Sequence, residues 1–167
     1  MSNIKERRLT WDVPCHPDTC VGDYVPFYFC QRSVMLHRIH MNQGKDDDPD
    51  LAYEGGQEGI VHLEADLHRV VDWAQSNGNL WAFSTANAAS SIANFHDDLS
   101  QLDAIDWGAV QTHDWSNVRA AKQAEFLVHR FVPWDLIYRI GVYSNSIRLR
   151  VGDLVKEARH RPKLKPR

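Results

Sequence analysis

The stretch AAKQAEFLVHRFVPWDLI, residues 120–137, places one carboxylate at the start of a strand-forming apolar run. The run begins with the large apolar side chains of residues 126–128, which are typical of a buried strand. Glu125 lies directly before them. On this pattern the carboxylate either forms an ion pair with Lys122 or Arg130, or stabilises a cation that develops during bond cleavage, as in glycosidic reactions. Both interpretations stay open at this point.

The composition fits one globular domain. The chain has 167 residues, of which 43% are hydrophobic and 25% are charged, enough to bury a core without disulfides. The formal net charge is -3, so nucleic-acid binding would need local basic patches instead of an overall positive field. One such patch is the basic tail at residues 156–167, which we interpret as a solvated, frayed end after a folded domain at residues 1–155.

The cysteine pattern indicates free thiols in a reducing cytoplasm. There are three cysteines, and the sequence shows neither a signal peptide nor an apolar stretch of about 18 residues, which argues against secretion and against a membrane span. Cys15-His16, Cys20 and Cys30 lack the repeated C-x-x-C spacing of zinc sites. We therefore expect no metal in this chain.

Short strand-like segments are mixed with a few helical ones, which favours an α+β fold over a doubly wound α/β fold. Pro26 predicts an edge strand or a bulge, because proline cannot donate a ladder hydrogen bond. Gly78 predicts the end of a helix. Strands are expected within residues 23–36, 59–65, 80–84, 125–131 and 136–144; helices at 67–78 and 86–102, with the end of a helix in 1–10; and irregular structure at 11–22 and 106–117.

Three blocks of the sequence resemble one known family. They are DYVPFYFCQRSVML (23–36), YEGGQEGIVHL (53–63) and LDAIDWGAVQTHDWSNVRAAKQAEFLVHRFVPWDLIYRIGVYS (102–144). In this order, and over most of residues 4–155, the chain is similar to the DarT family of bacterial DNA ADP-ribosyltransferase toxins. The resemblance implies an ADP-ribosyltransferase-like fold, with two small mixed sheets around an NAD cleft and peripheral helices. It also implies NAD-dependent transfer of ADP-ribose to a base in single-stranded DNA, most often thymine.

The resemblance assigns catalytic roles to residues near both ends of the chain. The family's catalytic glutamate falls on Glu125, and the Q-x-E pattern of related toxins makes Gln123 a contact to the acceptor base. An I-x-E-R-R block at residues 4–8 makes Arg8 the second catalytic residue. A guanidinium barely deprotonates, so we expect Arg8 to act as a cation that stabilises the deprotonated base and a pyrophosphate oxygen of NAD. Without the resemblance, this block is read as a solvated helix end.

Other residues are expected near the DNA strand. Arg32 and Met35, in the R-S-x-M-L block, are expected at the cleft or beside the DNA, and Arg119 is expected to contact a phosphate. Trp107 and Trp115 would either stack on bases or pack in the core. The resemblance further implies a macrodomain antitoxin, encoded next to this chain, as a protein partner.

The beginning of the chain departs from the family pattern. The family starts with a block like H-I-T-H that holds part of NAD, whereas this chain begins at Met1, just before the I-x-E-R-R block at residues 4–8. We expect an unpaired sheet edge and weaker NAD binding, by about 1–2 kcal/mol for each lost buried hydrogen bond. Val34 stands in place of the proline in R-S-P-M-L, and Thr85 in place of an acid. The alternative function is an inactive remnant or split half that binds single-stranded DNA or a protein without chemistry.

Overall fold

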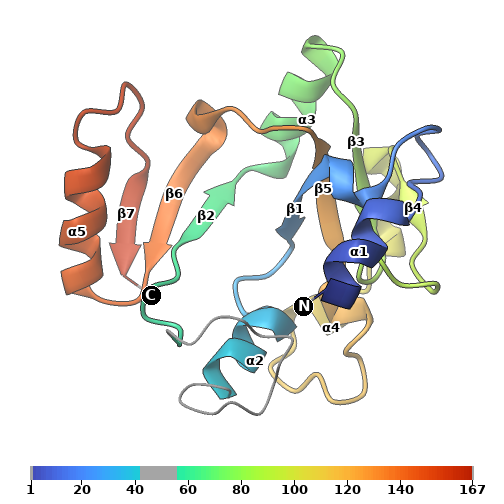
Figure 1. Ribbon diagram of the computed structural model, residues 1–167, viewed down its shortest axis with the longest axis horizontal. Helices are drawn as coiled ribbons and strands as arrows, with labels where there is room; N and C mark the ends of the chain where they lie inside the picture. Colours follow the sequence, from blue (N-terminus) through green and yellow to red (C-terminus); the bar gives the residue numbers. More distant parts are fainter. Residues whose placement is uncertain (1, 42–55, 167) are drawn as a thin grey trace. The chain divides into compact units, whose positions relative to one another are not determined.

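The computed structural model describes residues 2–41 and 56–166, and the chain divides into two compact units (Figure 1). One unit comprises Met1–His37 with Ala74–Phe131, and the other comprises Arg38–Trp73 with Val132–Arg167. Among the described residues, no helix combines the length and apolar character that a membrane span requires. The α-helices are α1 (Ser2–Thr10), α2 (Val34–Met41), α3 (Leu67–Ser76), α4 (Trp107–Gln111) and α5 (Asn145–Val155); the 3-10 helices are η1 (Val21–Asp23), η2 (Leu99–Ala104), η3 (Ala121–Gln123) and η4 (Trp134–Leu136); and the strands are β1 (Tyr24–Tyr28), β2 (His62–Ala65), β3 (Trp81–Ser84), β4 (Phe95–His96), β5 (Glu125–His129), β6 (Ile137–Val142) and β7 (Lys163–Pro166).

A four-stranded antiparallel sheet with the order β1-β5-β3-β4 forms the frame of the first unit. One of its two inner strands, β5, is buried on both faces, since Phe126, Leu127 and Val128 are at most 4% exposed. A continuous apolar run is what such a strand needs, and the prediction of a buried strand here is confirmed. The edge position predicted from Pro26 is also confirmed, because β1 lies at the end of the sheet with Pro26 opposite Leu127.

The segment 11–22 is irregular, as expected, yet it contributes to the core. Val13 and Val21 are 1% and 0% exposed and pack in a buried cluster with residues of β1, β3 and β5. A backbone hydrogen bond from the N–H of Val13 to the Thr19 carbonyl (3.1 Å) closes the segment on itself. The chain that follows α1 is therefore held against the sheet in a fixed shape.

The second unit contains a three-stranded sheet with the order β2-β6-β7. β2 pairs antiparallel with β6, whereas β6 and β7 are parallel, so the chain between them must cross over, and α5 makes that crossover. The frayed end expected for residues 156–167 is wrong at Lys163–Pro166, which form β7. Only Leu164 in this strand is apolar and large, so the sequence lacks the alternation of apolar and polar residues that would predict a strand. The strand depends on pairing with β6.

Two expectations about helices are wrong. Residues 86–102 form no α-helix; turns, β4 and part of η2 occupy them. The side-chain oxygen of Asn87 accepts from the Ala89 N–H at 3.0 Å, and this local turn competes with a helix. In contrast, the supposedly irregular residues 106–117 contain α4, because the Asp106 carboxylate caps the helix by accepting from the Ala109 N–H at 2.8 Å.

The strand expected over residues 23–36 ends at Tyr28, and its last residues belong to α2. The hydroxyl of the buried Ser33 accepts from the Leu36 N–H at 3.1 Å and thereby starts that helix. The other expected elements are confirmed. β2, β3, β5 and β6 lie within the predicted strands, and α3 ends before Gly78, which has a positive φ of 62°.

Candidate active site

The carboxylate of Glu125 is buried at the first position of β5, and only 1% of the residue is exposed. Its Oε1 accepts from the Ala88 backbone N–H at 3.0 Å and from Arg8 Nη1 at 3.2 Å, and its Oε2 accepts from Arg8 Nη2 at 2.9 Å. Burying a carboxylate is costly unless a counter-charge and hydrogen bonds compensate, and these three donors supply both. The ion-pair partner of Glu125 is thus Arg8, in place of Lys122 or Arg130.

The two adjacent arginines of α1 bind different elements: Arg8 binds β5, and Arg7 binds the turn at residues 86–90. Arg7 Nη2 donates to the Ala89 carbonyl at 2.8 Å, while the guanidinium of Arg8 binds Glu125. Since the N–H of Ala88 binds the same carboxylate, this turn links α1 to β5 at two consecutive residues. The Arg8 side chain remains 20% exposed. The I-x-E-R-R block thus combines one anchoring arginine with one arginine in the site.

The close approach of α1 depends on Gly22 in η1. A Cβ at this position would lie 2.9 Å from Leu9 Cδ2, 3.1 Å from Leu9 Cα and 3.2 Å from the Arg8 carbonyl oxygen. Two of these three atoms are backbone atoms of α1, which cannot rotate away as a flexible side chain can. Glycine is therefore needed for η1 to lie against the end of the helix that carries Arg8.

Ser84 and Tyr28 complete the surroundings of the carboxylate. The Oγ of the fully buried Ser84 accepts from the Glu125 N–H at 3.2 Å and donates to the Ala86 carbonyl at 2.7 Å. Tyr28 is the cross-strand partner of Glu125 in the pair β1–β5. Burial, followed by the negative charge of Glu125, raises the pKa of Tyr28 to about 12, so its hydroxyl stays protonated at neutral pH. The sequence reasoning missed both residues, although Tyr28 belongs to the YVPFYF block.

Lys122 is buried, with 3% of the residue exposed, and holds the segment before β5 in place. Its Nζ donates to the Val110 carbonyl at 2.9 Å and to the Thr112 carbonyl at 2.8 Å. These two carbonyls lie at the end of α4, so the ammonium group ties this end to η3, which leads directly into Glu125. The only sequence signal for this role is a lysine placed directly before an apolar run.

The expected acceptor residues lie on the segment before β5. Gln123 belongs to η3, and its Nε2 donates to the Arg119 carbonyl at 3.0 Å. The guanidinium of Arg119 lies 5.9 Å from the centre of the Trp115 ring, within cation–π range. Trp115 also meets the His37 ring edge to face, with 5.2 Å between the ring centroids. The structure therefore groups Gln123, Arg119 and Trp115 on one short segment.

Arg32 is linked to that same segment, while Met35 is exposed on α2. Arg32 Nη1 donates to His113 Nδ1 at 2.8 Å. Met35 is 40% exposed. Trp107, for which base stacking was one option, packs edge to face on Phe29 with 5.4 Å between the ring centroids. Because Trp107 is 36% exposed, this contact lies at the surface and not in the core.

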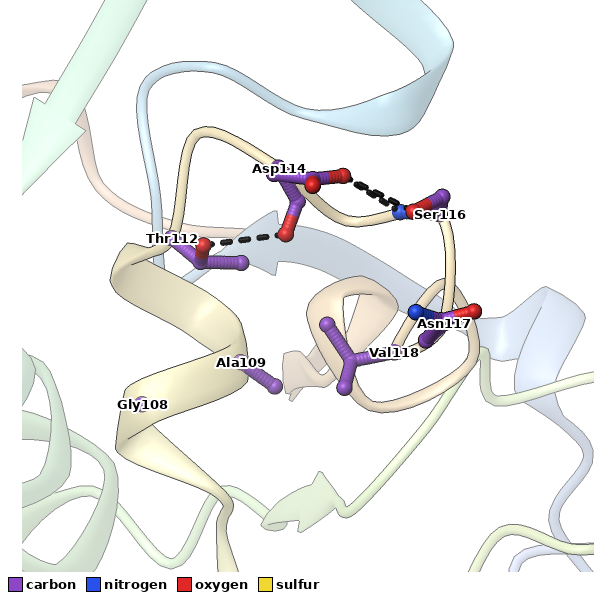
Figure 2. A pocket seen from close by; sticks show the side chains of 7 residues that line it. All are labelled: Gly108, Ala109, Thr112, Asp114, Ser116, Asn117 and Val118. Atoms are coloured by element: carbon purple, nitrogen blue, oxygen red, sulfur yellow. Dashed lines mark hydrogen bonds between the residues drawn. The ribbon is translucent and has the colours of Figure 1, made fainter.

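A pocket of about 250 Å³ lies between α4 and residues 112–118 (Figure 2). Asp114 Oδ1 accepts from the Oγ of Ser116 at 2.8 Å and from its N–H at 3.3 Å, and these bonds lower the pKa of Asp114. The Asp114 carbonyl accepts from Thr112 Oγ1 at 2.9 Å. An ionised carboxylate at this place disfavours a phosphate group in the pocket. The lining residues are Gly108, Ala109, Thr112, Asp114, Ser116, Asn117 and Val118.

The chain that forms this site matches one known protein family. The family described as "ssDNA thymidine ADP-ribosyltransferase, DarT" matches residues 1–167. The chain belongs to the DarT family. A curated relative from Thermus aquaticus, named DNA ADP-ribosyl transferase, is 37% identical over 155 residues, which cover 93% of this chain and 65% of that relative. The chain thus spans about two thirds of the length of this DarT relative.

Solved DarT structures share the fold. Thermus sp. 2.9 DarT in complex with ADP-ribosylated ssDNA is 35% identical and superposes with a TM-score of 0.87, covering 99% of this chain and 77% of that one. The same DarT in complex with NAD+ gives a TM-score of 0.77 at 35% identity, covering 87% and 71% of the two chains. The expected α+β, ADP-ribosyltransferase-like fold is therefore confirmed.

Proposed function

We propose that this DarT family member transfers ADP-ribose from NAD to a base of single-stranded DNA, with thymine as the target. The observation that carries the proposal is the buried carboxylate of Glu125, which Arg8 and Ala88 hold in one orientation. Family membership supports it, as does the Thermus sp. 2.9 DarT, whose solved complexes contain NAD+ and ADP-ribosylated ssDNA. A role as a toxin, opposed by a macrodomain antitoxin, extends the proposal on the family resemblance alone.

Glu125 stabilises the positive charge that develops on the ribose. As nicotinamide leaves, the bond between its ring nitrogen and the ribose C1′ breaks, both electrons go to the nitrogen, and the sugar becomes an oxocarbenium-like cation. A carboxylate in a water-poor site attracts this cation more strongly than it would in bulk water. Because Arg8 and Ala88 already fix the carboxylate, little reorganisation is needed when the charge develops.

Arg8 has donors left for the substrates after it binds Glu125. A guanidinium carries five N–H groups, and the bidentate pair with Glu125 uses two of them. The side chain is 20% exposed, and we propose that its other N–H groups bind the substrates. In the proposed reaction the thymine ring nitrogen loses its proton to water and attacks C1′, while the Arg8 cation stabilises the anionic base and an NAD pyrophosphate oxygen.

The segment before β5 supplies the proposed DNA contacts. Arg119 and Trp115 offer a positive charge beside an aromatic face, the two features that single-stranded DNA binds. The side chain of Gln123 makes an exposed hydrogen bond, which a base edge can replace at small cost. Arg32 and Met35 extend this proposed contact surface, with one further cation and one exposed apolar side chain.

The same surface favours a second candidate function, which is single-stranded DNA binding without chemistry. The Arg119–Trp115 pair does not involve Glu125, so it can bind a strand whether or not NAD is cleaved. Replacing Glu125 distinguishes the two functions. If the protein is a transferase, the replacement abolishes ADP-ribose transfer. If it is only a binding module, its function is DNA binding, and the replacement leaves the DNA affinity unchanged.

Mass spectrometry of DNA incubated with NAD tests the proposed function. The protein is mixed with NAD and a thymine-containing single-stranded oligonucleotide. We expect one ADP-ribose adduct per modified strand, and none when Glu125→Ala is introduced. The matched control is Glu157→Ala, an exposed glutamate, which should leave the adduct yield unchanged. An undiminished adduct with alanine at position 125 would refute the assignment.

A further inference from the structure

Cys15, His16 and Asp97 form a side-chain cluster that the proposed reaction does not use. One ligand atom from each residue lies within 4.8 Å of the other two. Cys15 and His16 are half-buried in the segment between α1 and η1, and the exposed Asp97 directly follows β4. The sequence argued against zinc because it lacks a repeated C-x-x-C pair, whereas the third donor here is a carboxylate that follows β4, far along the chain.

The backbone holds Cys15 and His16 in place through its own hydrogen bonds. The His16 N–H donates to the Val13 carbonyl at 2.8 Å, and Thr19 Oγ1 donates to the His16 carbonyl at 2.8 Å. Val13 is itself anchored in the core with 1% exposure. Two donor groups are therefore fixed by the fold, which reduces the entropy that a bound ion must overcome.

The orientation of the His16 ring leaves one nitrogen available. Its Nε2 lies 2.8 Å from the Trp81 carbonyl, and because a carbonyl can only accept, this nitrogen carries the proton. The neutral ring then keeps its lone pair on Nδ1. Histidines that bind metals commonly donate their other ring N–H to a backbone carbonyl, which fixes the tautomer and the ring direction. The ring also stacks on Tyr24, with 6.4 Å between the ring centroids.

We propose that Cys15, His16 and Asp97 bind one zinc-type divalent transition metal ion, with water in the fourth position. Thiolate, imidazole and carboxylate together suit zinc or cobalt, whereas magnesium and calcium prefer oxygen donors alone. In a tetrahedral site with bonds of about 2.0–2.3 Å, the ligand atoms are about 3.3–3.8 Å apart. Donor atoms within 4.8 Å of one another reach that spacing by small side-chain rotations.

A dication fits between the two donors that bind metals as anions. When the ion binds, the Cys15 thiol loses its proton to water, and the ion lies between the thiolate and the Asp97 carboxylate. The ion would also connect the segment that follows α1 to the end of β4, on the same unit as Glu125 and Arg8.

Cobalt and zinc titrations of the tag-free chain test the site. With Co²⁺ we expect one equivalent to bind and to produce a thiolate-to-cobalt charge-transfer absorption, which Cys15→Ser should abolish. The control is Cys20→Ser, a half-buried cysteine of the same segment, which should keep the absorption. Asp97→Asn should weaken zinc binding at least tenfold in calorimetry. Because Asp97 is exposed, we expect Asp97→Asn to keep the fold. Its zinc affinity therefore tests the site even if Cys15→Ser does not fold.

Thermal unfolding gives an independent readout that does not require activity. Zinc at 100 times its dissociation constant for the wild type should favour the folded state about 100-fold and raise the midpoint of the wild-type chain more than that of Asp97→Asn. No thiolate-to-cobalt absorption, an absorption that persists in Cys15→Ser, or one that Cys20→Ser removes would each overturn the proposal. Equal zinc affinity of the wild type and Asp97→Asn would do the same.

Discussion

Arg8 donates to both carboxylate oxygens of Glu125, although 117 positions in the sequence separate the two residues. The pair joins α1 to the first residue of the buried strand β5. Its geometry requires a planar guanidinium, because two N–H groups must reach two oxygens at once. A variant at this pair therefore changes the stability of the fold as well as the proposed reaction, and it must be assessed for both.

Replacing Arg8 leaves a buried carboxylate without its cation. We expect Arg8→Ala to lower the free energy of unfolding by about 3–5 kcal/mol, because breaking a buried pair by removing one partner has this order of cost. Urea unfolding followed by tryptophan fluorescence measures the change. Arg150→Ala, an exposed arginine on α5, is the control and should change stability by less than about 0.5 kcal/mol. In a double-mutant cycle with Glu125→Gln, a coupling energy near zero would contradict the assigned pair.

A methyl group at position 22 should displace α1. The Cβ of Gly22→Ala would meet the backbone of Leu9 and Arg8 at 3.1 and 3.2 Å, so we expect a loss of about 1–3 kcal/mol in stability. Because the displaced helix carries Arg8, adduct formation should fall more than the folded fraction does. The control is Gly152→Ala in α5, where the added Cβ makes an ordinary contact of 3.5 Å with Leu164. If Gly22→Ala were as stable and active as the wild type, close packing would not be what positions Arg8.

The contrast between β5 and the turn at residues 86–90 shows how far the sequence can lead. Phe126, Leu127 and Val128 identify a buried strand because their apolar run is local. Glu125 and Arg8 follow from the family resemblance, and the structure brings them together. The alanines of the turn carry no such signal, since their spacing also suits a helix. Their actual role is set by partners far along the chain: the Ala88 N–H binds Glu125, and the Ala89 carbonyl binds Arg7.

Lys122 and β7 were not predictable for a related reason. A lysine is normally solvated, and the burial of Lys122 depends on two backbone carbonyls that α4 brings to it. β7 is a strand because β6 offers it an edge, not because its own residues have a strong preference. In both cases the determining atoms belong to another element, so no local pattern contains the information.

Replacing the buried Lys122 should loosen the segment that leads into Glu125. Lys122→Met fills a similar volume but leaves the Val110 and Thr112 carbonyls without their donor, and we expect a loss of about 2–4 kcal/mol in stability. Single-stranded DNA affinity, measured by fluorescence anisotropy, should also fall, because Gln123 and Arg119 lie on the loosened segment. Lys156→Met, at the exposed end of α5, is the matched control. If Lys122→Met lost stability but kept full DNA affinity, Lys122 would not be needed to position the proposed DNA-binding residues.

The Tyr28 hydroxyl should make stability depend on pH in the alkaline range. Its folded-state pKa is about 12, against an ordinary value of 10.0, so the unfolded chain ionises first as the pH rises. The contribution of Tyr28 is thus fully present below pH 10 and is lost progressively between about pH 10 and 12. We expect the urea midpoint of Tyr28→Phe to fall less steeply over this interval than that of the wild type. The control is Tyr143→Phe, which replaces an exposed tyrosine and should retain the wild-type slope. If the curve of Tyr28→Phe ran parallel to that of the wild type, the Tyr28 hydroxyl would not be held neutral beside Glu125.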